Sequence, residues 1–237
     1  LEDDVSFFSK IDTASNTARR LNSGLDVFEV DDYLRNVDNV VVLPTDTKIR
    51  ILLTASDVIH AWWVPELGGK KDAIPGYINE MWIDISKPGI YRGQCAELCG
   101  KDHGFMPIVV DVVSKADYAA WVESKQAEKV AELASATQEW TEAELVARGE
   151  EVYNANCSGC HQKDGSGIPG VFPAMIGSEV TNGPADYQIG MVLNGLRGMP
   201  AFKMLSDTDI ASVITYERRS FGNNGSVVQP SDVTSAR

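Results

Sequence analysis

The sequence predicts a multidomain protein in which an antiparallel β-sandwich or barrel is followed by an all-α domain. Alternating side-chain character, as in TKIRILL at 47–53, indicates strands in the first part of the chain. Apolar residues at helical spacing dominate the last part. Between the two lies a stretch rich in Ala, Glu and Lys, with neither Gly nor Pro. We therefore predict a β domain at 1–122, a largely helical linker at 123–140 and an α domain at 141–237.

The composition excludes several classes of protein. The 34 acidic residues outnumber the 21 Lys and Arg, which gives a net charge of -13, whereas binding to nucleic acid needs clustered basic residues. Nucleic acid is therefore not expected as a partner. No run reaches the ~18 consecutive apolar residues that are needed to cross a bilayer.

Strands are expected where β-prone runs are bounded by turn residues such as Pro75-Gly76 and Pro88-Gly89. These runs lie at 40–43, 47–53, 81–85, 89–94 and 106–113. Ligands on such a scaffold gather on loops at one end of the sheet. The loop that follows the strand at 89–94 is therefore a candidate site, and His60 is expected on a second loop.

The loop sequence QCAELCGKDHGFM gathers four soft metal ligands, which are Cys95, Cys99, His103 and Met106. A mononuclear blue-copper site needs one Cys, two His and an axial Met, so this loop together with His60 has one thiolate too many. Two thiolates, two imidazoles and a thioether can instead hold two copper ions, with both sulfurs bridging. A Cys2His2 zinc site is the alternative, but zinc leaves Met106 and the Cys-x3-Cys spacing unexplained.

Capping residues separated by three positions mark three helix starts, at Ser114/Asp117, Thr141/Glu144 and Ser206/Asp209. The first pair begins the linker, and the second begins a helix that leads into a cysteine motif at 157–161. Gly222 is the expected stop of the last helix. The polar tail at 223–237 is expected to fray or to pack as an irregular strap.

The motif Cys157-Ser-Gly-Cys160-His161 is the attachment signature of c-type haem. Its thiols can reach both vinyl groups of the haem, and the adjacent His faces the iron. A thioredoxin-like redox pair or half of a zinc site is the alternative. Methionine is the remaining common ligand for the opposite side of the iron. Met199, in a Gly/Pro loop before the last helix, fits best, and Met175 is the second choice.

The quoted motifs resemble two known families. DVIHAWWVPELG, KKDAIPG and GIYRGQCAELCGKDHGFMPI are similar to subunit II of haem-copper cytochrome c oxidase, which carries the dinuclear copper centre called CuA. The segment at 141–230 resembles a small all-helical cytochrome c. Joined in this order, the two look like the extramembrane part of a caa3-type subunit II. This resemblance implies a cupredoxin-like fold for the first domain.

The resemblance also implies roles for individual residues. The implied copper ligands are the side chains of His60, Cys95, Cys99, His103 and Met106 and the backbone carbonyl of Glu97. The carboxylate of Glu97 is then expected to help bind magnesium where subunit II meets subunit I. Trp62 and Trp63, beside His60, could lie near the copper or serve as packing aromatics.

The function implied by this family is electron transfer. Electrons pass from cytochrome c to the chain's own haem c, then through CuA to the haem a of subunit I. Oxygen is reduced to water there, coupled to proton pumping, so the oxygen chemistry of this oxidoreductase and translocase resides in another subunit. Subunit I, other membrane subunits and a reduced cytochrome c or other upstream donor are the expected partners. The family also implies transmembrane helices before Leu1, which place the soluble domains on the periplasmic or outer face of a bacterial cell membrane.

Three rival interpretations remain. A zinc-stabilised, haem-bearing sensor or binding module predicts one bound zinc and no copper. A nitrous oxide reductase also has a CuA domain, but its catalytic cluster needs a His-rich propeller, and all three His of this chain are already assigned. A quinol oxidase subunit II shares the β fold but lacks the copper ligands, so the intact ligand set of this chain argues against that interpretation.

Overall fold

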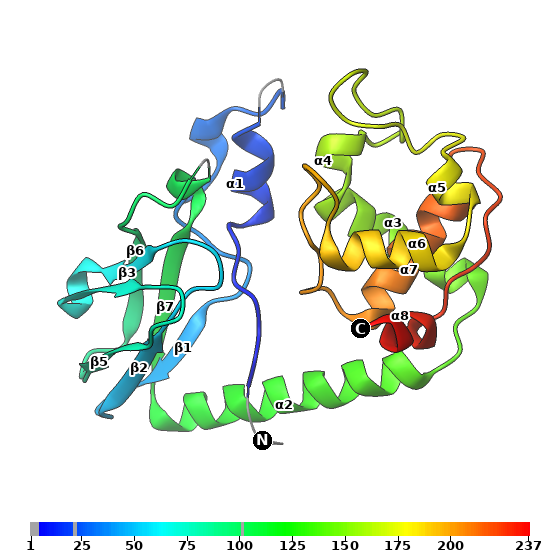
Figure 1. Ribbon diagram of the computed structural model, residues 1–237. Coiled ribbons are helices and arrows are strands. Elements are labelled where there is room, and N and C mark those ends of the chain that lie inside the picture. The colour runs from blue at the N-terminus through cyan, green and yellow to red at the C-terminus, as the bar shows by residue number, and fades with distance from the viewer. Residues whose placement is uncertain (1–4, 21–22, 101) are drawn as a thin grey trace. The chain divides into compact units, whose positions relative to one another are not determined.

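The computed structural model describes residues 5–20, 23–100 and 102–237, which form two compact units divided between Gln126 and Ala127. The first unit is built on strands and the second on helices (Figure 1). This confirms the predicted order of a β domain and an α domain. Within the described part of the chain, no helix combines the length and apolar character that crossing a membrane requires.

The β unit contains a five-stranded sheet in the order β1-β7-β6-β3-β4 and a two-stranded sheet of β2 and β5. The strands are β1 (Val41–Pro44), β2 (Ile49–Leu53), β3 (His60–Val64), β4 (Gly69–Ala73), β5 (Asn79–Ile83), β6 (Gly89–Cys95) and β7 (Pro107–Val113). Each of the five predicted runs overlaps a strand, whereas β3 and β4 were not predicted. His60 begins β3, so its expected place on a loop is wrong.

One pairing departs from an antiparallel sheet. β1 runs parallel to β7, with Val41 opposite Val110, whereas β6 pairs antiparallel with both β7 and β3. The alternation of residues along a strand sets its buried face but not the direction of its neighbour. Val64, Val110 and Val112 form the centre of the core beneath these strands.

The chain before β1 lies against the sheet and contains α1 (Thr13–Ala18) and the 3-10 helix η1 (Val27–Glu29). Asp12 caps α1 by accepting a hydrogen bond from the Ser15 amide. Arg92 of β6 donates hydrogen bonds to Asp32 at 2.9 Å and to Asn36 at 2.8 Å. These bonds attach the segment to the strand that ends at the candidate site.

The helical elements are α2 (Lys115–Thr137), α3 (Glu142–Asn156), α4 (Ser158–His161), α5 (Glu179–Asn182), α6 (Ala185–Asn194), α7 (Asp207–Arg219) and α8 (Pro230–Ala236). All three predicted capping pairs are confirmed. The hydroxyl oxygens of Ser114, Thr141 and Ser206 each accept a hydrogen bond from the amide three residues later. α7 ends at Arg219, three residues before the predicted stop.

α3 packs closely against α7 because Gly149 has no side chain. A Cβ at this position would lie 2.6 Å from the Cβ of Tyr216 and would also clash with the carbonyl of Ser212. Tyr153 of α3 is fully buried, and its ring centroid lies 5.3 Å from that of Tyr216. This crossing leads α3 directly to the cysteine motif.

The prediction of an irregular tail is wrong for residues 230–236, which form α8. Gln229 and Asp232 form a capping box, and Val228 and Val233 are fully buried against the helical core. Thr215 of α7 exchanges hydrogen bonds with the backbone of Val228 at 3.0 and 3.1 Å. Burial of these two valines therefore orders a segment whose composition is mostly polar.

Candidate metal centre and haem attachment site

The first site lies at one end of the five-stranded sheet, where three chain segments meet. Cys95 is the last residue of β6, and its amide donates a hydrogen bond to the carbonyl of Met106, just before β7. The pairing of β3 with β6 places Trp62 opposite Cys95, so His60 lies at the same end. Trp62 is partly buried, and Trp63 on the other face is more exposed.

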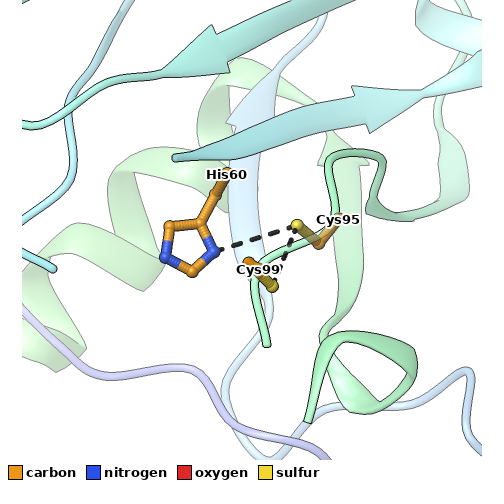
Figure 2. A group of neighbouring side chains, drawn as sticks. All are labelled: His60, Cys95 and Cys99. Carbon is orange, nitrogen blue, oxygen red and sulfur yellow. Dashed lines mark hydrogen bonds between the residues drawn. The ribbon is translucent and has the colours of Figure 1, made fainter. Parts of the chain in front are cut away.

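The two cysteine sulfurs lie at the centre of this site. Figure 2 shows them with the ring of His60. The Sγ atoms of Cys95 and Cys99 are 3.7 Å apart, and both cysteines are free. The Nδ1 atom of His60 is 3.9 Å from Cys95 Sγ, although 35 residues separate the two in sequence. Together these three form a group whose ligand atoms all lie within 4.8 Å of one another.

The remaining predicted ligands surround the same sulfurs. The carbonyl oxygen of Glu97 is 3.3 Å from Cys95 Sγ. On the other side, His103 Nδ1 and Met106 Sδ are each 3.4 Å from Cys99 Sγ. Each sulfur therefore faces one imidazole nitrogen, and each half of the group has one weaker donor.

The orientation of His60 follows from its second ring nitrogen. His60 Nε2 is 3.0 Å from a carboxylate oxygen of Asp57. An ionised carboxylate only accepts hydrogen bonds, so Nε2 carries the proton and the neutral ring keeps a lone pair on Nδ1, which faces Cys95. A carboxylate behind a ligating imidazole is typical of metal sites. Asp57 was not predicted as part of the site. Its position three residues before His60 was the one signal in the sequence that pointed to it.

The local electrostatics favour a thiolate. Burial raises the pKa of the Cys95 thiol, but its hydrogen-bonding surroundings, first among them the backbone of Ala61 and Glu97, lower it to about 6. Burial, together with the neighbouring Cys95, raises the pKa of Cys99. Cys95 therefore ionises readily, and its negative charge favours the protonated form of Cys99. Metal binding, which requires deprotonated sulfurs, releases that proton.

This donor set fits a pair of copper ions. Thiolate, thioether and imidazole donors all suit copper, and two thiolates at this separation could each contact both ions. A single tetrahedral zinc ion would use the two sulfurs and two imidazoles and would leave the thioether and the carbonyl without a role. The carboxylate of Glu97 belongs to no group of three or more candidate metal ligands among residues 5–20, 23–100 and 102–237.

The second site lies where α3 passes into α4. Cys157 is the C-cap residue of α3, and its carbonyl accepts hydrogen bonds from the amides of Cys160 and His161. His161 is buried, and its Nδ1 lies 2.9 Å from the carbonyl oxygen of Pro173. A carbonyl can only accept, so Nδ1 carries the proton and Nε2 is left with a lone pair for a metal ion. The short turn and this tautomer fit a haem c held by both cysteines and His161.

The two candidate methionines lie in different surroundings. Met175 is 8% exposed and packs in the core of the helical unit. Met199 is only partly buried and lies in a tight loop, where its backbone exchanges hydrogen bonds with Leu196. Gly195 permits this loop, since its φ is +75° and a Cβ would lie 2.6 Å from the Met199 carbonyl. Met199 as the iron ligand remains a prediction.

The matches to known proteins agree with the geometry of both sites. Residues 18–113 match the family described as cytochrome c oxidase subunit II, periplasmic domain. Residues 144–216 match the family described as cytochrome c oxidase, cbb3-type, subunit III.

Individual proteins resemble the first of these segments. A probable cytochrome c oxidase subunit 2 of Rickettsia bellii is 56% identical over 92 residues, which are 39% of this chain and 34% of that protein. The subunit 2 of Arabidopsis thaliana is 51% identical over 92 residues, covering 39% of this chain and 35% of that protein. The chain thus spans about a third of the length of these relatives.

A solved structure is also similar. The crystal structure of the periplasmic domain of subunit II of cytochrome oxidase (CoxB) of Bradyrhizobium japonicum is 38% identical. That match covers 54% of this chain and 81% of that chain, with a TM-score of 0.46. By its two family matches, the chain belongs to the cytochrome c oxidase subunit II family through its β domain and carries a cytochrome c domain after it.

Proposed function

We propose that this chain is the electron-transfer subunit of a terminal haem-copper oxidase. Electrons pass from its own haem c, through a dinuclear CuA centre, to the haem a of subunit I. The observation that carries this proposal is the convergence of two free thiols, two imidazole Nδ1 atoms, a thioether and a carbonyl within 3.3–3.9 Å contacts at one end of the sheet. A haem attachment motif in the same chain supports a relay of electrons from a haem to the metal centre.

The residues of each site suit transfer rather than catalysis. His161 and Met199 would hold a haem iron between them and would leave no place on it for a substrate. Cys95 and Cys99 would hold the copper pair through their thiolates, and the pair would take up and pass on one electron at a time. Asp57 behind His60 and Pro173 behind His161 hold the two rings in the tautomers that the metals require. The protein thus supplies position and potential, and the cofactors supply the redox chemistry.

The proposed partners follow from this role. Subunit I and other membrane subunits receive the electrons, reduce oxygen to water and pump protons, and a reduced cytochrome c or another upstream donor supplies them. The match to a periplasmic domain supports a place on the outer face of a bacterial cell membrane, with the protein anchored there. Magnesium at the Glu97 carboxylate remains a prediction, and Glu97→Ala in the assembled complex should remove that magnesium if the side chain binds it.

The test is a visible spectrum of the full chain, oxidised and reduced, with copper, zinc and iron quantified on the same sample. A pair of copper ions with a purple absorption, together with one iron and a reducible c-haem band, is the expected result. One zinc in place of copper, after maturation with copper available, identifies the zinc-stabilised module instead and overturns the oxidase proposal.

A further inference from the structure

A cation at the C-cap of α1 lies against the loop that carries two of the proposed copper ligands. The guanidinium carbon of Arg19 is 4.2 Å from the centroid of the Phe105 ring, which is within the range of a cation–π contact. A guanidinium nitrogen of Arg19 lies 3.7 Å from a carboxylate oxygen of Asp102. Arg19 therefore contacts the residue before His103 and the residue before Met106.

The two contacts differ in strength. Asp102 is well exposed, so its ion pair with Arg19 is screened by solvent and contributes little by itself. The Arg19 side chain is only 23% exposed, and its guanidinium covers the ring of Phe105. The cation–π contact with Phe105 is therefore the main link between Arg19 and the loop.

Arg19 is itself held in place by the segment before β1. Its Nε donates a hydrogen bond to the side-chain oxygen of Asn16, 2.9 Å away. Ser15 of α1 is fully buried, and its hydroxyl accepts a hydrogen bond from the Leu34 amide. The segment is tied to β6 through Arg92, as described above. The guanidinium is thus presented to the loop from a fixed position.

The loop makes short-range backbone hydrogen bonds at this point, from the His103 amide to the Gly100 carbonyl and from the Phe105 amide to the Asp102 carbonyl. His103–Phe105 form a single 3-10 turn, η3, with no side-chain hydrogen bond at its N-cap. The carbonyl of Met106 is fixed by the amide of Cys95 at 3.0 Å. Phe105 lies between the two proposed ligands, so a contact that fixes its ring also fixes the backbone on which both ligands are mounted.

We propose that Arg19 is a positioning residue for the metal ligands His103 and Met106 and a fixed positive charge beside their centre. This inference rests on the copper centre proposed above. A nearby cation destabilises the more positive, oxidised state of a metal site more than its reduced state. Arg19 therefore slows loss of metal by holding the loop, and it raises the midpoint potential by its charge.

The experiment uses the full chain loaded with copper, in four variants. Arg19→Met removes the charge but keeps an apolar stem, and Arg19→Lys keeps the charge but loses the guanidinium. Phe105→Leu removes the ring and leaves every charge in place. Arg20→Met is the control, because the neighbouring Arg20 is exposed and the substitution changes the net charge equally.

The expected results separate the two roles. Release of copper to a chelator becomes about two- to fivefold faster in Arg19→Met and in Phe105→Leu, the size expected for loss of one partly exposed cation–π contact. The midpoint potential of the copper centre falls in Arg19→Met but not in Arg19→Lys or Phe105→Leu. Arg20→Met matches the wild type in both measurements.

Unchanged copper release in both Arg19→Met and Phe105→Leu overturns the positioning role. Equal potentials in Arg19→Met and Arg20→Met overturn the charge effect. A wild-type chain that takes up no copper contradicts the proposed function itself, and this outcome is recognised before any variant is compared.

Discussion

The sulfur atoms of Cys95 and Cys99 lie 3.7 Å apart, yet the two residues form no disulfide. This separation is well beyond the S–S bond of about 2.05 Å and leaves room for metal ions in contact with both sulfurs. His60 and His103 face the pair with their Nδ1 atoms, one at each sulfur. The arrangement is therefore compatible with a metal site and not with a disulfide crosslink.

Cys99→Ser should abolish the dinuclear copper centre. The serine hydroxyl is a poor ligand for copper and cannot bridge two ions as a thiolate does. We expect loss of the purple absorption and binding of at most one copper ion per chain, measured by metal analysis and visible spectroscopy. Cys160→Ser is the matched control, because it weakens attachment of the haem and leaves the copper spectrum intact. A bridged spectrum that persists in Cys99→Ser contradicts the proposed ligand set.

Met199→Ala should abolish the charge-transfer band between methionine sulfur and oxidised haem iron. Met175→Ala should retain this band but unfold at lower denaturant concentration, since Met175 is buried in the helical core. Loss of a buried Met side chain costs about 2–5 kcal/mol. The near-infrared edge of the visible spectrum and a urea titration measure the two effects. The reverse pattern assigns the iron ligand to Met175.

Gly149→Ala should destabilise the helical unit. The added Cβ would lie 2.6 Å from the Cβ of Tyr216, so α3 and α7 must separate. We expect a loss of about 1–3 kcal/mol in the free energy of unfolding, the usual cost of overpacking. Gly190→Ala in α6 is the control, because its Cβ has no neighbour within 4 Å and the substitution should be neutral or slightly stabilising. Equal stability of the two variants contradicts the close crossing of α3 and α7.

Glu217 should make the stability of the helical unit depend on pH. Burial raises the pKa of this carboxyl from its ordinary 4.5 to about 8, although a hydrogen bond from Gln188 lowers it. The folded state therefore keeps a proton that the unfolded state releases between these values. The stabilisation is fully present below pH 4.5 and is lost as the pH rises to about 8, with a total on the order of a few kcal/mol.

Glu217→Gln should flatten this dependence, because the amide stays neutral at every pH. Chemical denaturation of the haem-loaded chain at several pH values measures the slope. Glu142→Gln is the control, since Glu142 is exposed and its ion pair with Arg219 lowers its pKa, which places its titration below this pH window. A slope that is the same in the wild type and in Glu217→Gln overturns the assignment.

The sequence by itself determined the local features of this protein. The ligands from Cys95 to Met106, the haem attachment motif and the capping pair Thr141 and Glu144 each lie within about a dozen residues. Such patterns can be recognised in the sequence because their chemistry depends on the spacing of residues within one short segment. The runs that became strands were also recognisable, since burial of one face imposes an alternation on the residues.

The tertiary structure alone decided which distant segments meet. The pairing of β3 with β6 brings His60 to Cys95, and the parallel pairing of β1 with β7 fixes the order of the sheet. Arg19 meets Phe105, and Val233, which belongs to a tail that looked polar, is buried in the helical core. Contacts of this kind depend on how distant segments pack together in the folded domain. The spacing of residues within one segment does not specify that packing.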